Sequence, residues 1–243
     1  MKRRFVLAAL PIALLTLTGA TAKKPAAKRA PAKAAAPAPK PAPLGDTVRI
    51  VMVTTAGTIE LELDHKAAPI TTENFVHYVD TRRFDGMTFY RAMHLPWGDQ
   101  PNGLIQAGLR GNPQKIFPPI AHEPTSQTGL SHRTGAISMA RNAPGTADAD
   151  FSILLSDLTS LDADPASPNP ETQAGYAVFG RVVTGMDVVK AIWDSPISPD
   201  KGEGPLKGQM LDPPVKIITV RRAPVQAPVQ APAPAASPPA PVQ

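Results

Sequence analysis

Residues 48–63 read VRIVMVTTAGTIELEL, and apolar side chains recur at alternate positions on both sides of Ala56-Gly57. Such alternation is typical of a strand with one buried face, and a Gly-containing break between two such runs predicts a hairpin. We therefore expect two antiparallel strands here. Further runs with strand character are residues 87–93, 104–106, 135–139, 151–155, 176–183 and 215–220.

Two helices are expected between these strands. Residues 70–81 carry an apolar stripe at helical spacing, with Thr71 or Thr72 available as the capping residue. Residues 186–193 form the second apolar helical run. Many short strands, few helices and long polar loops favour a mainly β fold, a closed antiparallel barrel with helices over its ends.

The N-terminus has the three parts of a secretory signal. Lys2-Arg3-Arg4 precedes an apolar run over residues 5–17, and Ala20-Thr21-Ala22 provides small residues for cleavage. We expect residues 1–22 to be a signal peptide that is removed after Ala22, which predicts an exported and periplasmic protein. An uncleaved membrane anchor is the alternative, but the apolar run falls short of the roughly 20 residues that span a bilayer.

Segments rich in proline and alanine flank the central domain, which we place at residues 46–222. Residues 23–45 form a Lys/Ala/Pro-rich linker, and residues 223–243 form a tail that begins with an APVQ repeat. Neither segment has the apolar content to bury a core, so both are predicted to be disordered. They serve as inert spacers, or else the basic linker makes a weak contact with an anionic surface of the cell envelope.

Charge and composition exclude several classes of protein. The chain has net charge +5, but nine Lys and Arg and no acidic residue lie in its first 45 residues, so the remainder is mildly acidic. A nucleic-acid-binding domain is therefore not expected. The absence of cysteine excludes thiol chemistry. The five histidines lack ligand-like spacing, so no metal or other cofactor is predicted. No G-x-S-x-G motif is present, and Ser131 and Ser138 lack the local pattern of a serine nucleophile.

Four ordered blocks carry a family resemblance. They are APITTENFVHYVDTRRFDGMTFYRAM, LIQAG, GAISMARNAPGTADADFSI and GYAVFGRVVTGMDVV, at residues 68–93, 104–108, 135–153 and 175–189. Together they resemble the cyclophilin family of peptidyl-prolyl cis-trans isomerases across nearly all of residues 48–220. The resemblance implies an eight-stranded antiparallel barrel closed by two helices. It also implies an enzyme that turns X-Pro bonds without a cofactor.

The resemblance also assigns site residues. Arg91 in Phe89-Tyr90-Arg91 matches the family's catalytic arginine, and Gln106 matches the glutamine that holds the peptide carbonyl. A guanidinium suits this reaction because it can donate to the prolyl nitrogen as the amide loses its resonance. Outside this motif, a surface ion pair would be the better interpretation of Arg91. The groove-lining positions that match are Leu104 and Ala140, and Tyr176 stands in the groove where the family often has a histidine.

The chain departs from the family pattern at the proline pocket. Asp150 replaces a common glutamine, and Ser152 replaces the phenylalanine whose ring floors the pocket in the family. The segment between Arg91 and Gln106 is longer than the family turn and contains Trp97. We hypothesise that Trp97 folds over the groove and replaces part of the missing apolar wall, or alternatively packs on the barrel rim.

Three functions follow as hypotheses. The leading one is a monomeric isomerase that assists the folding of exported proteins by acting on unfolded or proline-containing polypeptides, with Arg91 as a non-covalent electrostatic catalyst. The second is a binding module, a chaperone or scaffold that grips proline-containing segments but turns them over slowly because Ser152 has replaced the ring. The third is a structural domain whose proline-rich arms are the functional part.

Overall fold

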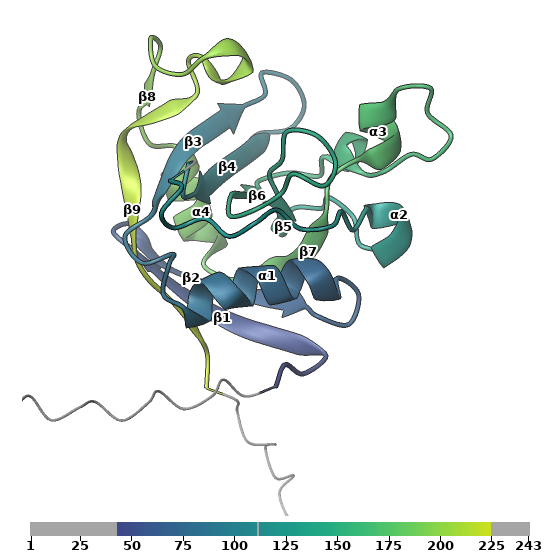
Figure 1. The fold of residues 1–243 in the computed structure, drawn as a ribbon. Helices are drawn as coiled ribbons and strands as arrows, with labels where there is room; N and C mark the ends of the chain where they lie inside the picture. The colour runs from purple at the N-terminus through teal and green to yellow at the C-terminus, as the bar shows by residue number, and fades with distance from the viewer. Residues whose placement is uncertain (1–42, 111, 225–243) are drawn as a thin grey trace, which may run out of the picture. The chain divides into compact units, whose positions relative to one another are not determined.

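The computed structural model describes residues 43–110 and 112–224, and within them eight strands form a closed antiparallel barrel (Figure 1). Around the ring the strands are β1 (Thr47–Thr54), β2 (Gly57–Asp64), β7 (Val178–Thr184), β5 (Ala136–Met139), β6 (Phe151–Leu154), β4 (Gly103–Gly108), β3 (Thr88–His94) and β9 (Met210–Arg222). Pairing of β9 with β1 closes the ring. A two-residue strand, β8 (Ile197–Ser198), adds to the side of β9. The predicted eight-stranded barrel is confirmed.

The predicted hairpin is the β1–β2 pair. Its register runs from Thr47 opposite Asp64 to Thr54 opposite Gly57. Burial alternates along both strands, so that Ile50 and Leu61 are fully buried while their neighbours are not. The apolar residues of the alternating pattern are therefore those on the inward face of the barrel.

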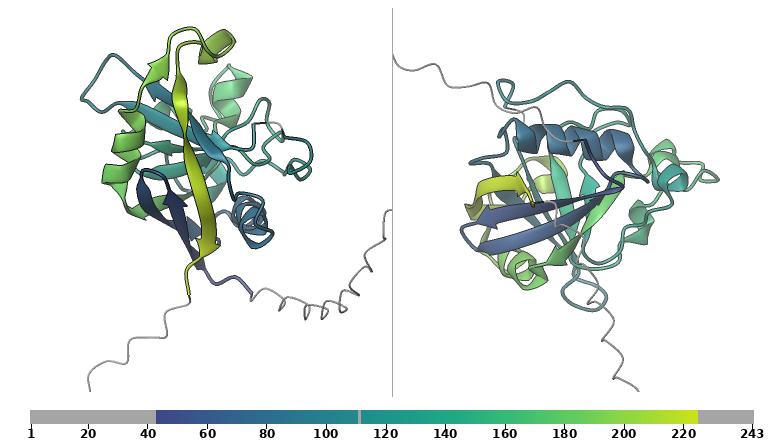
Figure 2. Two further views of the ribbon diagram at one scale, coloured as in Figure 1. Left: turned by 90° about the vertical axis from the view of Figure 1, so that its left-hand side faces the viewer. Right: turned by 90° about the horizontal axis from the view of Figure 1, so that it is seen from below.

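Both predicted helices are present, and Figure 2 shows them on opposite sides of the barrel. They are α1 (Pro69–Asp80) and α4 (Met186–Trp193). The ring of Phe75 on α1 packs against Phe151 of β6 at 5.3 Å between ring centroids, which ties this helix to the barrel core. The remaining elements are short helices and 3₁₀ turns that were not predicted: α2 (Thr125–Thr128), α3 (Pro170–Ala174), η1 (Thr159–Leu161) and η2 (Gly204–Leu206).

The predicted cap of α1 is wrong. The helix begins at Pro69, upstream of the expected start, so Thr71 and Thr72 lie inside its first turn and are buried. Proline is favoured at this first position because its missing N–H has no helical partner to lose. Ala68 occupies the capping position and supplies no side-chain hydrogen bond.

Glu123 takes over the role of the cap from a distant loop. Its carboxylate accepts hydrogen bonds from the backbone N–H groups of Ile70 and Thr71, at 3.1 Å and 2.7 Å. It also accepts from the Thr71 hydroxyl at 2.6 Å. Glu123 is 1% exposed, so a buried negative charge sits at the positive end of the helix dipole. This contact fixes the long loop after β4 to α1.

The predicted signal peptide, most of the linker and most of the tail fall on residues 1–42 and 225–243, outside the described residues. Across the part of the chain that the structure covers, no helix is both long and apolar enough to cross a bilayer.

Candidate active site

Four polar residues lie opposite one another on four neighbouring strands. Arg91 of β3 is paired with Gln106 of β4, Gln106 with Ser152 of β6, and Ser152 with Ser138 of β5. Directly opposite residues on antiparallel strands share one face of the sheet. The adjacent row, Phe89, Ala107, Phe151 and Met139, is buried in the core, so the polar row belongs to the outer face.

This polar row borders a cavity of about 210 Å³. The structure brings six of the predicted site residues to the cavity: Arg91, Leu104, Gln106, Ala140, Ser152 and Tyr176. The other residues that line it are Met93, Ser138, Met139, Arg141, Leu154 and Leu161. The strands β3, β4, β6 and β5 carry most of this wall, and they lie side by side in Figure 1.

The guanidinium of Arg91 is held by two neutral amides. Its Nε donates to Gln209 Oε1 and its Nη1 donates to Gln106 Oε1, both at 2.8 Å. A weaker contact joins Nη2 to Met93 Sδ at 3.5 Å. Among the described residues, no carboxylate forms an ion pair with Arg91, so the surface ion-pair interpretation does not apply. Burial lowers the pKa of Arg91, yet an arginine remains protonated in proteins. The cavity therefore has a fixed, unneutralised positive charge on its wall.

Asp150 does not line the cavity, which corrects its predicted role in substrate binding. Its carboxylate accepts from the Tyr90 hydroxyl at 2.8 Å and from the backbone N–H of Leu109 at 2.7 Å. Burial raises the pKa of Asp150 despite these hydrogen bonds. A Cβ at Gly108 would lie 1.8 Å from the Asp150 carboxylate. The side chain therefore fixes the end of β4 and lies outside the cavity lining.

Trp97 does not cover the cavity either. The side chain is absent from the cavity lining, and the residue is 63% exposed, so the folded-over arrangement is wrong. The loop closes on itself instead, because the side chains of Asn102 and Gln100 donate to the Trp97 carbonyl at 2.5 Å and 3.3 Å. These hydrogen bonds form within the loop itself, and the indole of Trp97 stays in solvent.

Sequence reasoning missed several cavity residues. Gln209 holds Arg91 from the start of β9, at a separation of 118 residues, and no local pattern in the sequence marks it. Ser138 and Arg141 lie in the GAISMARN block, and their positions within that block were the available signal. The Arg141 guanidinium stacks over the Tyr176 ring at 4.6 Å and so orients that wall of the cavity.

A chain of hydrogen bonds runs behind the Ser138 side of the cavity. Ser138 Oγ lies 2.8 Å from His132 Nε2, and His132 Nδ1 lies 2.6 Å from Asp162 Oδ1. Asp162 also accepts from the His132 backbone N–H at 2.9 Å and from the Ser131 hydroxyl at 2.5 Å. His132 is fully buried, so this chain is part of the wall and not a surface contact.

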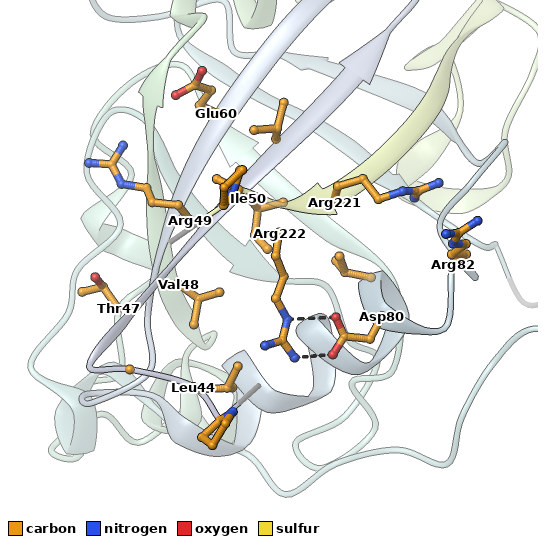
Figure 3. Close-up of a pocket in the computed structure, with 16 residues that line it drawn as sticks. Leu44, Thr47, Val48, Arg49, Ile50, Glu60, Asp80, Arg82, Arg221 and Arg222 are labelled. Carbon is orange, nitrogen blue, oxygen red and sulfur yellow. Dashed lines mark hydrogen bonds and ion pairs between the residues drawn. The ribbon is translucent and has the colours of Figure 1, made fainter. Parts of the chain in front are cut away.

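A larger cavity, of about 680 Å³, lies where β1 and β9 meet beside α1 (Figure 3). Three of the arginines that line it are paired with carboxylates. Arg222 bonds to Asp80, Arg49 lies 3.1 Å from Glu62, and Arg221 lies 2.7 Å from Asp85. These pairs link β1 to β2, and β9 to α1 and to the loop that follows it. We therefore take the smaller cavity, with its unneutralised Arg91, as the candidate active site.

The chemistry open to this cavity is electrostatic stabilisation of a neutral polypeptide. Arg91 can donate hydrogen bonds, and Leu104, Leu154 and Leu161 supply apolar contacts. Within residues 43–110 and 112–224, no group of three or more His, Asp or Glu side chains is placed to hold a metal ion.

Comparison with known proteins identifies relatives of this chain. The family model described as cyclophilin type peptidyl-prolyl cis-trans isomerase matches residues 49–222. A peptidyl-prolyl cis-trans isomerase of Acinetobacter baylyi is 35% identical over 71% of this chain and 84% of its own length. Peptidyl-prolyl cis-trans isomerase A of Dickeya dadantii is 34% identical over 60% of this chain and 71% of its own length.

A solved structure shows the same fold at low sequence identity. It is a cyclophilin type peptidyl-prolyl cis-trans isomerase of Cryptosporidium parvum, crystallised in the presence of the dipeptide Ala-Pro. The match has a TM-score of 0.57 and 18% identity, and it covers 72% of this chain and 99% of the other.

Proposed function

Because this chain belongs to the cyclophilin-type peptidyl-prolyl cis-trans isomerase family and is an enzyme of that activity, we propose that catalysis takes place in the cavity beside Arg91. The observation that carries the proposal is that the Arg91 guanidinium is held by hydrogen bonds but keeps its charge. Two amide oxygens fix its direction without neutralising its charge. A half-buried cation held in this way can act on a substrate without first breaking an ion pair.

The proposed mechanism is non-covalent. The X-Pro amide is planar because of resonance, and the rotation barrier is about 18–20 kcal/mol. In the twisted transition state the prolyl nitrogen regains its lone pair and accepts a hydrogen bond from Arg91, an interaction that the planar ground state offers only weakly. Gln106 positions the guanidinium, and its own amide NH₂ is available to the peptide carbonyl. No bond to the enzyme forms at any stage.

Chemical-shift mapping with an X-Pro tetrapeptide tests the location of the site. We expect titration to shift the backbone amides of β3, β4 and β6, with Tyr176 also affected. The cavity between β1 and β9 is the internal control, because it is larger but three of its arginines are paired with carboxylates. Shifts confined to β1 and β9 would refute the proposed site.

The proposed substrates are unfolded, proline-containing polypeptides outside the cytoplasm, on which a monomer acts as a folding catalyst. The support is the signal-like pattern of residues 1–22. Mass spectrometry of the protein isolated from a periplasmic fraction tests it. A mature N-terminus at Lys23 is expected, and an intact chain recovered only from the cytoplasm would refute export.

A proline-peptide-binding module with weak turnover is the second candidate function. It is favoured by the polar side chains of Ser152 and Ser138, which face the cavity where the resemblance implied an aromatic floor. A binding module would grip the peptide but would leave the rotation of the X-Pro bond largely uncatalysed.

Replacing Ser152 by phenylalanine separates the two functions. We expect Ser152→Phe to raise kcat/KM for an X-Pro tetrapeptide about tenfold, since some 50–60 Å² of added apolar contact contributes roughly 1.4 kcal/mol. Ser152→Ala, which removes the hydroxyl without adding a ring, is the matched control and should change kcat/KM much less. A protease-coupled assay measures both. A wild type as inactive as a no-enzyme blank, with activity only in Ser152→Phe, would favour the binding module.

A further inference from the structure

Ser138, His132 and Asp162 are aligned as a nucleophile, a base and an orienting carboxylate. The two distances, 2.8 Å from Ser138 Oγ to His132 Nε2 and 2.6 Å from His132 Nδ1 to Asp162 Oδ1, are both within hydrogen-bond reach. These are the contacts that a serine nucleophile needs in order to be activated by a neighbouring base. The isomerase mechanism uses none of the three residues.

The hydrogen-bond pattern sets the position of the protons. Asp162 Oδ1 can only accept, so His132 donates from Nδ1 and carries its lone pair on Nε2. Ser138 then donates its hydroxyl proton to that lone pair. Burial lowers the pKa of His132 even though Asp162 opposes the shift, so the imidazole is neutral and can accept a proton at neutral pH. Burial alone would raise the pKa of Asp162, but hydrogen bonds from Ser131 and His132 hold that pKa below its ordinary value. The Asp162 carboxyl therefore stays ionised.

Ser138 also borders space that a substrate can occupy. It lines the 210 Å³ cavity, and the residue opposite it on β6 is the small Ser152. An aromatic ring at position 152 would fill the space in front of the Ser138 hydroxyl. Gln106 lies beyond Ser152 in the polar row, two strands from Ser138, and because its Oε1 accepts from Arg91, its NH₂ remains to donate to a developing oxyanion.

We propose that Ser138 is an activated nucleophile and that the protein hydrolyses small acyl esters through an acyl-Ser138 intermediate. Ser138 Oγ attacks the ester carbonyl while its proton passes to His132 Nε2. The tetrahedral intermediate collapses, the ester C–O bond breaks, and the alcohol leaves with that proton. Water then attacks the acyl group, gives a proton to His132, and releases the carboxylic acid as Ser138 recovers its hydroxyl proton.

The size of the cavity limits the substrate class. A volume of about 210 Å³ corresponds to roughly seven water molecules at about 30 Å³ each. Short acyl groups such as acetyl and butyryl fit this space. The cation of Arg91 on the same wall further favours esters that develop or carry negative charge.

Labelling of the full chain with a fluorophosphonate, together with hydrolysis of p-nitrophenyl acetate, tests the proposal. Peptide mapping should place the label on Ser138, and Ser138→Ala should reduce labelling and hydrolysis to background. His132→Asn should lower both rates about a hundredfold, the usual contribution of a general base. Ser195→Ala is the matched control, because the Ser195 hydroxyl donates to the Ala191 carbonyl of α4 and has no histidine partner in the described part of the chain. This variant should be labelled at the same rate as the wild type.

Two further measurements test whether a loss of ester hydrolysis in the variants comes from misfolding. Ser152→Phe should suppress ester hydrolysis at least tenfold by covering Ser138, while the same variant is expected to raise isomerase activity, so a loss in one assay alone cannot come from unfolding. The labelling rate of the wild type should also fall in acid, and only below the ordinary histidine pKa of about 6.5, because burial lowers the pKa of His132. A label on another residue, or hydrolysis unchanged in Ser138→Ala, would overturn the proposal.

Discussion

Replacing Glu123 by alanine is expected to lower the free energy of unfolding by about 2–4 kcal/mol. The substitution removes the acceptor for two helix N–H groups and the Thr71 hydroxyl, and it leaves the two buried donors of Thr71 without a partner. The thermal midpoint should fall by roughly 5–12 °C for a domain of this size. Urea titration followed by circular dichroism measures the change.

Glu73→Ala is the matched control for this prediction. Glu73 lies on the same helix, and its side chain is 65% exposed and pairs only with His65 at 3.2 Å. An exposed pair of this kind contributes little, so the control should change stability by less than about 1 kcal/mol. Equal losses in the two variants would show that the buried cap of α1 has no special role.

Replacing Arg91 by alanine is expected to lower kcat/KM for X-Pro isomerisation by about ten- to a hundredfold. One hydrogen bond from a charged donor contributes about 1.5–3 kcal/mol, and each factor of ten in rate corresponds to about 1.4 kcal/mol. The loss should appear mainly in kcat, because the interaction strengthens in the twisted transition state. A protease-coupled assay at several peptide concentrations separates kcat from KM.

Arg91→Lys is the conservative counterpart. A lysine keeps the charge but cannot donate at once to Gln106, to Gln209 and to the substrate, as the planar guanidinium can. We therefore expect intermediate activity. Full activity in Arg91→Lys would mean that charge alone suffices and that the two amide contacts have no catalytic value.

The regular part of the fold was predictable from local sequence patterns. The alternation in residues 48–63 gave the hairpin because each strand has one face in the core. The start of α1 was not predictable in the same way. Its cap is Glu123, 52 residues away from Thr71, and only the tertiary structure brings the two together.

The same distinction between local pattern and tertiary contact applies to the candidate site. Arg91, Gln106 and Tyr176 were found because the family blocks contain them, whereas Gln209 and the partners of Ser138 come from distant segments. Trp97 was misassigned because a polar loop can satisfy its backbone internally and leave an aromatic side chain in water. Asp150 was misassigned because a carboxylate beside a groove can instead accept a hydrogen bond from the backbone, here from the N–H of Leu109.

The most direct test of the central claim is the exchange rate of one X-Pro peptide between cis and trans, measured by NMR exchange spectroscopy at saturating peptide. Arg49→Ala serves as the control, because Arg49 borders the other cavity and pairs with Glu62. Wild type and Arg49→Ala should accelerate exchange equally, well beyond the uncatalysed time of tens to hundreds of seconds. Arg91→Ala should bind the peptide but exchange it at least tenfold more slowly. Exchange in Arg91→Ala as fast as in the wild type would contradict the account.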